Sequence, residues 1–410
     1  MPSLLAKRTA PVVTGLGVAT GFGYGKDSLI EGLFGGRNLF GPLKRPGRQP
    51  PYPHAAFIGA EVPEPPDVLS KRVARTAGLA GRVTVAVVQE AWTEARLGEL
   101  DGKRIGLVVG GSNLQSRELL LAQEDARGRQ GVVSPHLGYS FFDTDVCGLV
   151  AETFGIRGVT YTVGGASASG AIAVMHAASL VSSGEVDACI AVGALQDLSY
   201  FELHALQVMG ALGPRDPAMH SCRPFDRMHD GFLFGESAAA LVIQRDEAST
   251  GQECYGRIAG YAHIADGHRG PDPSLEGEVR AIRAALADAD LTPGAIDYIN
   301  AHGTGTPLGD DTEVAAYREA GLTAAAINAT KSILGHGIAS AGAVEAAVTL
   351  LQMRLGRLHP TRHLNDPIDL DLRWVRDEPL GCHVRHALSL SFGFGGINTA
   401  LALSAVEREG

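Results

Sequence analysis

Short apolar runs alternate with longer stretches of helical periodicity along most of the chain. Runs at 104–110, 159–163 and 187–192 are rich in β-branched and small apolar residues, which predicts buried strands. Residues 77–96 instead repeat apolar side chains at helical spacing. Strands that alternate with helices in this way predict an α/β fold, with helices covering a mostly parallel sheet.

The same alternation begins again after residue 255. Strands are predicted at 256–264, 296–301, 326–329, 387–392 and 398–403, and helices at 279–289, 310–320 and 340–355. This repeated alternation of strands and helices predicts two halves with related folds, residues 1–250 and 251–410. Stretches rich in Pro and Gly interrupt the pattern, and they predict a surface excursion at 40–66 and a loop-rich segment at 205–235.

A run of very small residues, 164–170, separates the strand at 159–163 from an apolar helix at 171–181, and Ser167 lies at its tip. A tight turn from strand to helix places a side chain at the helix N-terminus, where free N–H groups and the helix dipole favour negative charge. The same run is equally compatible with a close-packed turn that has no chemistry. Ser167 therefore needs partners elsewhere in the chain to be identified as a functional residue.

Two histidines are such candidate partners. His302 lies in Asn-Ala-His-Gly-Thr-Gly-Thr at 300–306, and His336 lies in Lys-Ser-Ile-Leu-Gly-His-Gly at 331–337. Each follows a short predicted strand and precedes a helix, and the carboxyl ends of strands are where α/β sheets bind ligands. Neutral imidazoles at this edge are suited to donating N–H bonds to a thioester or enolate oxygen.

Composition excludes several classes of function. The 410 residues are 45% hydrophobic and carry a net charge of −10 without a long basic run, so nucleic acid is not an expected partner. The five cysteines are odd in number and lack metal-ligand spacing, so neither a disulfide framework nor a metal site is expected. Gly15-Leu16-Gly17 lacks the remaining glycine of a dinucleotide fingerprint.

The apolar segments are also short. The first eight residues lack the apolar region of a secretory signal, and no apolar run reaches membrane-spanning length. We therefore expect a cytoplasmic protein that does not associate with a membrane.

Both histidine segments resemble signatures of one protein family. Three segments of the chain resemble signatures of the β-ketoacyl synthase branch of the thiolase superfamily. They are His-Gly-Thr-Gly-Thr-Pro-Leu-Gly-Asp at 302–310, Lys-Ser-Ile-Leu-Gly-His at 331–336 and Ser-Phe-Gly-Phe-Gly-Gly-Ile-Asn at 391–398. Arg-Pro-Phe-Asp at 223–226 and Val-Thr-Gly-Leu-Gly at 13–17 resemble its central loop and first strand. The resemblance covers nearly the whole chain. It implies a thiolase fold with duplicated βαβαβ halves in five αβαβα layers, and a homodimer with residues 159–166 as the interface strand.

One departure from the family pattern bears on function. The family turn Thr-Ala-Cys-Xaa-Ser-Gly reads Gly-Ala-Ser-Ala-Ser-Gly at 165–170, so Ser167 occupies the position of the nucleophilic cysteine. The resemblance implies catalytic roles for Ser167, His302, His336, Lys331 and Phe394. It implies substrate contacts for Thr304, Thr306, Phe392 and Gly395. We expect Lys331 to pair with Glu313, and the backbone N–H groups of Ser167 and Phe394 to form an oxyanion hole.

Serine at this position changes the expected chemistry. A cysteine thiol has a pKa of about 8.5, which a helix N-terminus lowers, whereas an alcohol is far less acidic. A helix dipole contributes only about 0.3–2 kcal/mol and cannot close that gap. Loss of CO₂ from a malonyl thioester needs no nucleophile, but only a dry site and donors for the enolate oxygen. We therefore expect condensation to be lost and decarboxylation to remain.

This pattern resembles the ketosynthase-like decarboxylases of polyketide β-branching, which convert malonyl-acyl carrier protein to acetyl-acyl carrier protein for a hydroxymethylglutaryl-CoA-synthase-like enzyme. The expected partner is malonyl-loaded acyl carrier protein. Its phosphopantetheine arm delivers the substrate, and no cofactor of the protein's own is expected. Two alternatives stay open. In one, Ser167 is acylated with His302 or His336 as base, giving an acyltransferase or a condensing enzyme. In the other, the chain is a non-catalytic, chain-length-factor-like partner of an active ketosynthase.

Overall fold

The computed structural model describes residues 10–213, 220–246 and 253–406. The first eight residues, on which the expectation about a secretory signal rests, lie outside the described residues. Pro214 and Pro217 of the predicted loop at 205–235 lie outside them as well.

The strands agree closely with the predicted apolar runs, and several short strands are additional. They are β1 (Val12–Thr20), β2 (Gly23–Tyr24), β3 (Gly41–Pro42), β4 (Ile58–Ala60), β5 (Ile105–Gly110), β6 (Thr160–Val163), β7 (Ala188–Gly193), β8 (Phe234–Gly235), β9 (Ser237–Gln244), β10 (Gly256–Ala265), β11 (Tyr298–Asn300), β12 (Ala326–Asn328), β13 (Arg357–Leu358), β14 (Arg373–Trp374), β15 (Leu380–Gly381), β16 (His386–Gly393) and β17 (Ile397–Ser404).

The predicted helices are also present. The helices are α1 (Lys26–Phe34), α2 (Lys71–Ala74), α3 (Leu79–Glu94), α4 (Ser116–Gly128), α5 (Leu137–Ser140), α6 (Thr144–Phe154), α7 (Ser169–Ser182), α8 (Tyr200–Val208), α9 (Leu275–Asp288), α10 (Pro307–Ala320), α11 (Lys331–Leu334) and α12 (Ala341–Leu355).

The main sheet runs in the order β14-β12-β11-β16-β17-β10-β1-β9-β7-β5-β6, and it is mixed rather than mostly parallel. Among the described strands of this sheet, parallel pairs join β5 to β6 and β7, β11 to β12 and β16, and β12 to β14. The strands between these groups pair antiparallel, because β16 and β17 form a hairpin and β9 runs against both β1 and β7. The expectation of a mostly parallel sheet was wrong for this central part.

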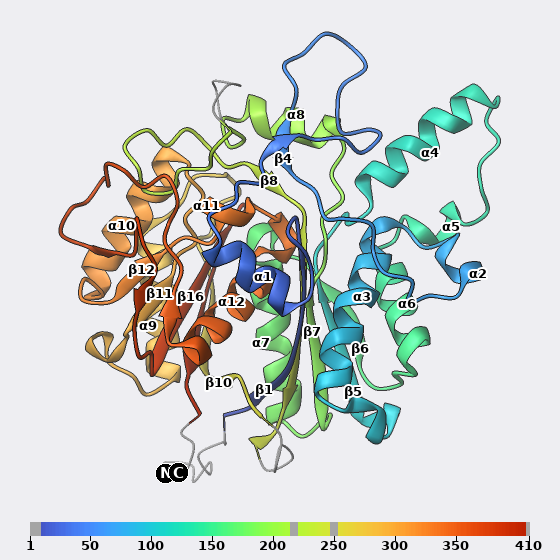
Figure 1. Cartoon of the computed structure of the whole chain (residues 1–410). Coiled ribbons are helices and arrows are strands. Elements are labelled where there is room, and N and C mark those ends of the chain that lie inside the picture. The colour runs from blue at the N-terminus through green and yellow to red at the C-terminus, as the bar shows by residue number, and fades with distance from the viewer. Residues whose placement is uncertain (1–9, 214–219, 247–252, 407–410) are drawn as a thin grey trace.

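The two halves meet along a narrow seam. Strands β1 and β10 pair through only Val12 with Arg257 and Val13 with Gly256, so each half keeps a sheet of its own. Helices α7 and α12 lie between these sheets, α3 and α6 cover the outer face of the first, and α9 and α10 cover the outer face of the second (Figure 1). The result is five layers in the order predicted from the resemblance.

The two central helices approach each other very closely. A Cβ atom on Gly170 of α7 would fall 2.6 Å from the backbone N of Ala343 in α12, so only glycine fits there. Residues 338–355, which include α12, form a run long and apolar enough to cross a membrane, contrary to the sequence expectation. That run is 83% buried inside the protein, as the core helix of a layered fold is. The close crossing brings the N-termini of both helices to one place.

Residues 40–66 are less superficial than their Pro and Gly content predicts. Arg48 is fully buried, Phe57 is 3% exposed, and β4 pairs with β8 from the second part of the first half. The prediction of a surface excursion was wrong for Arg48 and for 57–60, which are buried, but it agrees with 51–53 and 55–56, which are exposed.

Candidate active site

Ser167 lies in a sharp turn between β6 and α7. Ala166, just before it, has a φ of 47°, in the left-handed region. This conformation is unfavourable for a residue other than glycine, so contacts with the surrounding residues must hold it. The Ser169 hydroxyl provides that constraint, because it accepts the N–H of Gly165 at 2.9 Å and donates to the carbonyl of Ala166 at 2.8 Å. Ser167 thereby lies in the short helical turn Ala166–Ala168 that leads into α7, and its side chain is buried.

His336 faces this hydroxyl directly. Its Nε2 lies 2.8 Å from Oγ of Ser167, and its Nδ1 accepts the backbone N–H of Ile338 at 3.3 Å. A neutral imidazole whose Nδ1 accepts carries its proton on Nε2. His336 therefore presents an N–H donor toward the Ser167 side of the cavity.

His302 is held by the ammonium of Lys331. The Nζ of Lys331 lies 3.3 Å from Nδ1 of His302 and donates to its backbone carbonyl at 2.5 Å. Because Nδ1 faces a donor, Nε2 of His302 carries the proton too. The two imidazole rings meet edge to face, with centroids 5.8 Å apart. Burial, and then the positive charge of Lys331, hold the pKa of each imidazole well below its usual range, so both are neutral donors.

The acidic partner of Lys331 is Glu345 of α12, at 2.5 Å, and not Glu313. Glu313 instead accepts the backbone N–H groups of His302 and Gly303, at 2.7 and 2.8 Å, and the hydroxyl of Tyr317. The predicted Lys331–Glu313 pair was therefore wrong, because Glu313 is occupied by the backbone of the His302 loop. Burial raises the pKa of Glu313 and of Glu345 to about 7, against the opposing effect of Lys331 on Glu345.

Phe394 projects from the hairpin turn between β16 and β17, next to the Ser167 turn. Gly393 packs so closely against this turn that a Cβ there would lie 2.4 Å from the carbonyl oxygen of Gly165. The ring of Phe394 is 38% exposed and lies on the wall of two cavities. Two positive-φ glycines, 395 and 396, follow it and form the turn.

The two cavities meet at Ser167, His336 and Phe394. The first, of about 290 Å³, also contains His302 and the predicted substrate-binding residues Thr304, Thr306 and Phe392. Gly395 is not on its wall, and its predicted substrate contact stays a prediction. The second cavity, of about 570 Å³, extends beyond Ser167 toward α4 and α8. Sequence reasoning gave no sign of its size.

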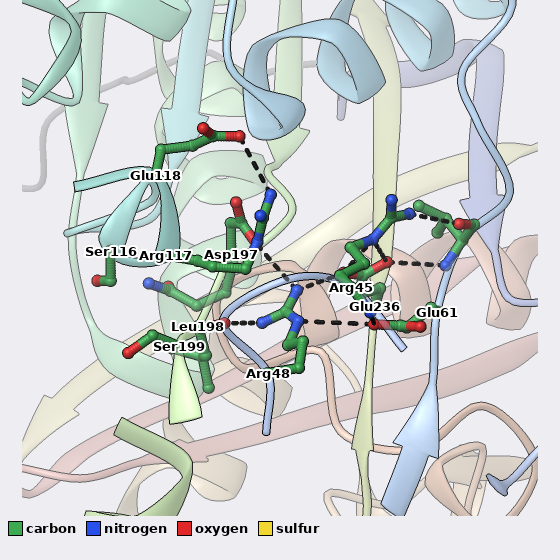
Figure 2. A network of polar contacts seen from close by, with 12 residues as sticks. Arg45, Arg48, Glu61, Ser116, Arg117, Glu118, Asp197, Leu198, Ser199 and Glu236 are labelled. Atoms are coloured by element: carbon green, nitrogen blue, oxygen red, sulfur yellow. Dashed lines mark hydrogen bonds and ion pairs between the residues drawn. The ribbon is translucent and has the colours of Figure 1, made fainter. Parts of the chain in front are cut away.

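His336 is positioned by a strand that a buried ionic network supports. Its backbone N–H donates to Leu233 at 2.7 Å, and its carbonyl accepts from Gly235 at 3.2 Å, on either side of Phe234 in β8. Glu236 follows directly, and Figure 2 shows Arg48 reaching both Glu236 and Asp197. The Arg48 guanidinium also lies over the ring of Phe234, 5.1 Å from its centroid. The network thus anchors the segment to which the His336 backbone is bonded.

Sequence reasoning missed two carboxyl groups of this region. Glu345 is the one charged residue in the run Ala-Gly-Ala-Val-Glu-Ala-Ala-Val at 341–348, and a lone carboxylate on an apolar helix signals a buried partner. Glu278 of α9 also lines the first cavity, and nothing in its sequence surroundings marks it. Within the described ranges, no group of three or more His, Cys, Asp or Glu residues is placed to hold a metal ion.

Comparison with known proteins identifies the family. The models of the N-terminal and C-terminal domains of β-ketoacyl synthases match residues 10–249 and 255–365. The chain belongs to the β-ketoacyl synthase family. Its relatives include the polyketide biosynthesis malonyl-ACP decarboxylase PksF of Bacillus subtilis (strain 168), 49% identical over 97% of both chains. The 3-oxoacyl-(acyl-carrier-protein) synthase 2 of Synechocystis is 33% identical over 99% of this chain and 100% of that protein.

Solved structures of the family confirm the thiolase fold. A β-ketoacyl synthase from Burkholderia phymatum superposes with a TM-score of 0.86 at 27% identity, covering 97% of this chain and all of that one. The ishigamide ketosynthase/chain length factor gives 0.87 at 28% identity, covering 98% of this chain and all of that one. The layers described above are therefore those of a β-ketoacyl synthase.

Proposed function

We propose that this β-ketoacyl synthase relative converts malonyl-acyl carrier protein to acetyl-acyl carrier protein and does not condense acyl groups. The observation that carries the proposal is the pairing of a serine at the nucleophile position with two neutral imidazoles. The decarboxylase name of the 49% identical relative from Bacillus subtilis supports the same reaction.

The chemistry follows from the donors around the cavity. The malonyl thioester enters through the first cavity with its carbonyl oxygen toward Nε2 of His302 and His336. The bond between C2 and the carboxylate carbon breaks, CO₂ leaves, and the electron pair passes to the thioester oxygen. Two preorganised N–H donors stabilise that enolate in a site sheltered from water, which is where such donors have their largest effect. Phe394 covers the site while the enolate exists.

Ser167 is poorly suited to accept an acyl group. Its Oγ faces an imidazole nitrogen that carries a proton, so His336 in this tautomer offers no base for the hydroxyl. His302 is the other imidazole, and Lys331 occupies its Nδ1. These contacts weigh against the serine-acylation alternative. The intact pair of imidazoles on the cavity wall weighs against the non-catalytic alternative.

The wider setting of the proposal rests on the resemblance. The protein acts as a homodimer on malonyl-loaded acyl carrier protein, whose phosphopantetheine arm reaches Ser167 through the first cavity. The acetyl-carrier product then serves a hydroxymethylglutaryl-CoA-synthase-like enzyme in polyketide β-branching.

Intact-protein mass spectrometry of the carrier tests the proposal. Purified protein is incubated with malonyl-carrier protein, alone or together with an acyl-carrier protein as second substrate. We expect the malonyl carrier to lose the mass of CO₂ in both mixtures, with no condensed product in the second. A carrier that keeps its malonyl group, or a β-ketoacyl product, would refute the proposal.

A further inference from the structure

Glu278 stands on the wall of the same cavity as the catalytic imidazoles. It lies in the first turn of α9 and is 1% exposed. The cavity of about 290 Å³ that contains Ser167, His302 and His336 also contains Glu278. Its Oε2 is buried and has no hydrogen-bond partner. A buried carboxyl oxygen without a partner costs stability, and such groups in native proteins call for an explanation.

The surroundings of Glu278 favour its acid form. Burial raises its pKa well above the usual range, and the negative charges of Glu313 and Asp266 raise it further. These two, with Tyr317 of α10, are the titratable groups that interact with it across the helix contacts. Asp266 is already engaged, since it accepts the side-chain N–H of Asn398 at 2.6 Å. The acid form of Glu278 is therefore favoured, and its Oε2 has no hydrogen-bond partner among the described residues.

The proposed reaction needs a proton donor for C2, and the other site residues do not supply one. In a condensing enzyme, C2 of the enolate attacks an acyl group, but here no acyl nucleophile awaits it. The carbanion must take a proton to become a methyl group. The imidazoles of His302 and His336 are neutral and serve the enolate oxygen, so a separate acid is needed for the carbon.

We propose that Glu278 is the general acid that protonates C2 of the enolate across the cavity that both occupy. This inference rests on the proposed function. The O–H bond of Glu278 breaks as the new C2–H bond forms, the thioester carbonyl is restored, and the negative charge passes to the Glu278 carboxylate. A solvent proton entering through the cavity mouth then restores the acid. Over one turnover, malonyl thioester and one proton give acetyl thioester and CO₂.

The test compares Glu278→Gln with Glu276→Gln. The first variant keeps the shape of the side chain and removes the acidic proton. The second makes the same change two residues earlier in α9, where the side chain is 82% exposed. Both are assayed for kcat on malonyl-carrier protein between pH 5 and 9, and thermal unfolding checks their fold. Glu278→Asp serves as a second variant, because it keeps the acid but withdraws it by one methylene.

We expect Glu278→Gln to lower kcat by about 10²–10⁴-fold, as loss of a general acid does. Wild-type kcat should fall at high pH, as the raised pKa of Glu278 is passed, and this alkaline limb should disappear in Glu278→Gln. Glu276→Gln should match the wild type, and Glu278→Asp should keep the alkaline limb at reduced kcat. Because the lost oxygen had no partner, Glu278→Gln should unfold no earlier than the wild type.

Two results would overturn the assignment. One is a Glu278→Gln kcat within twofold of the wild type, and the other is a lowered kcat whose alkaline limb is unchanged. A wild-type protein that forms no acetyl-carrier protein would instead refute the proposed function itself, so the two failures are distinguishable.

Discussion

The hydroxyl of Ser167 lies 2.8 Å from Nε2 of His336, while Nδ1 of that ring accepts the N–H of Ile338. The imidazole thus donates toward the serine and is not poised to deprotonate it. The contact places an N–H donor and a hydroxyl side by side on the cavity wall.

This relationship predicts that Ser167 is not acylated during turnover. After incubation with malonyl- or acetyl-carrier protein, peptides spanning the Ser167 turn should keep their unmodified mass. Ser167→Cys should acquire an acyl adduct under the same conditions, because a thiol at a helix N-terminus is readily ionised. An acylated Ser167 in the wild type would favour covalent catalysis instead.

A second prediction concerns the corrected partner of Lys331. Glu345→Gln leaves the buried ammonium without its acidic partner, and breaking a buried pair costs about 3–5 kcal/mol of unfolding free energy. Decarboxylation should fall as well, because Lys331 orients the ring of His302. Urea unfolding and initial rates measure both effects. Glu319→Gln, on the exposed side of α10, should change neither. Wild-type stability in Glu345→Gln would contradict the ion pair.

Motif recognition located the candidate site residues, but not the side chains that hold them in place. Ser167, His302, His336 and Phe394 lie in turns whose glycines and spacing are visible in the sequence. The support comes from side chains whose importance depends on burial, such as Glu345 on α12 and Arg48 in a segment that composition predicts to be superficial. Their partners are distant in sequence, so no local pattern reveals the pairing.

The layers were predicted, whereas the strand directions of the central sheet were not. Alternating strands and helices indicate layering, but the antiparallel centre arises from the β16–β17 hairpin and from the placement of β9 between β1 and β7. The pairing of β1 with β9, for example, joins segments more than two hundred residues apart in the sequence. Hydrophobic periodicity carries no information about such pairings.

The buried network around Arg48 gives a third prediction. Arg48→Ala removes the cation that Asp197 and Glu236 share, although Arg117 still pairs with Asp197 and Arg45 with Glu236. Because all three side chains of the shared contact are buried, the unfolding free energy should fall by more than the about 1 kcal/mol of an exposed pair. Arg104→Ala breaks a half-exposed pair with Asp187 and should cost at most about 1 kcal/mol. Denaturant unfolding of both variants makes the comparison. Equal losses would show that the buried network does not anchor β8.

A fourth prediction concerns the free edge of the sheet. Strand β6 ends the strand order, with its residues half-buried in the single chain. A homodimer that continues the sheet there predicts twice the 42.8 kDa chain mass in sedimentation equilibrium. Introducing carboxylates by Tyr161→Asp and Thr162→Asp should give monomers, because charges directly opposite across a dyad repel. Thr153→Asp, on the exposed face of α6, should stay dimeric. A monomeric wild type would contradict this interface.

The most direct measurement of the central claim compares Ser167→Ala with His302→Ala and His336→Ala in the conversion of malonyl- to acetyl-carrier protein. If two imidazole donors carry the reaction without a nucleophile, Ser167→Ala keeps most of the wild-type rate. Each histidine variant then loses about 10²–10³-fold in kcat, as for removal of one oxyanion donor. A Ser167→Ala variant as inactive as the histidine variants would contradict the account, because it would show that the reaction passes through the serine.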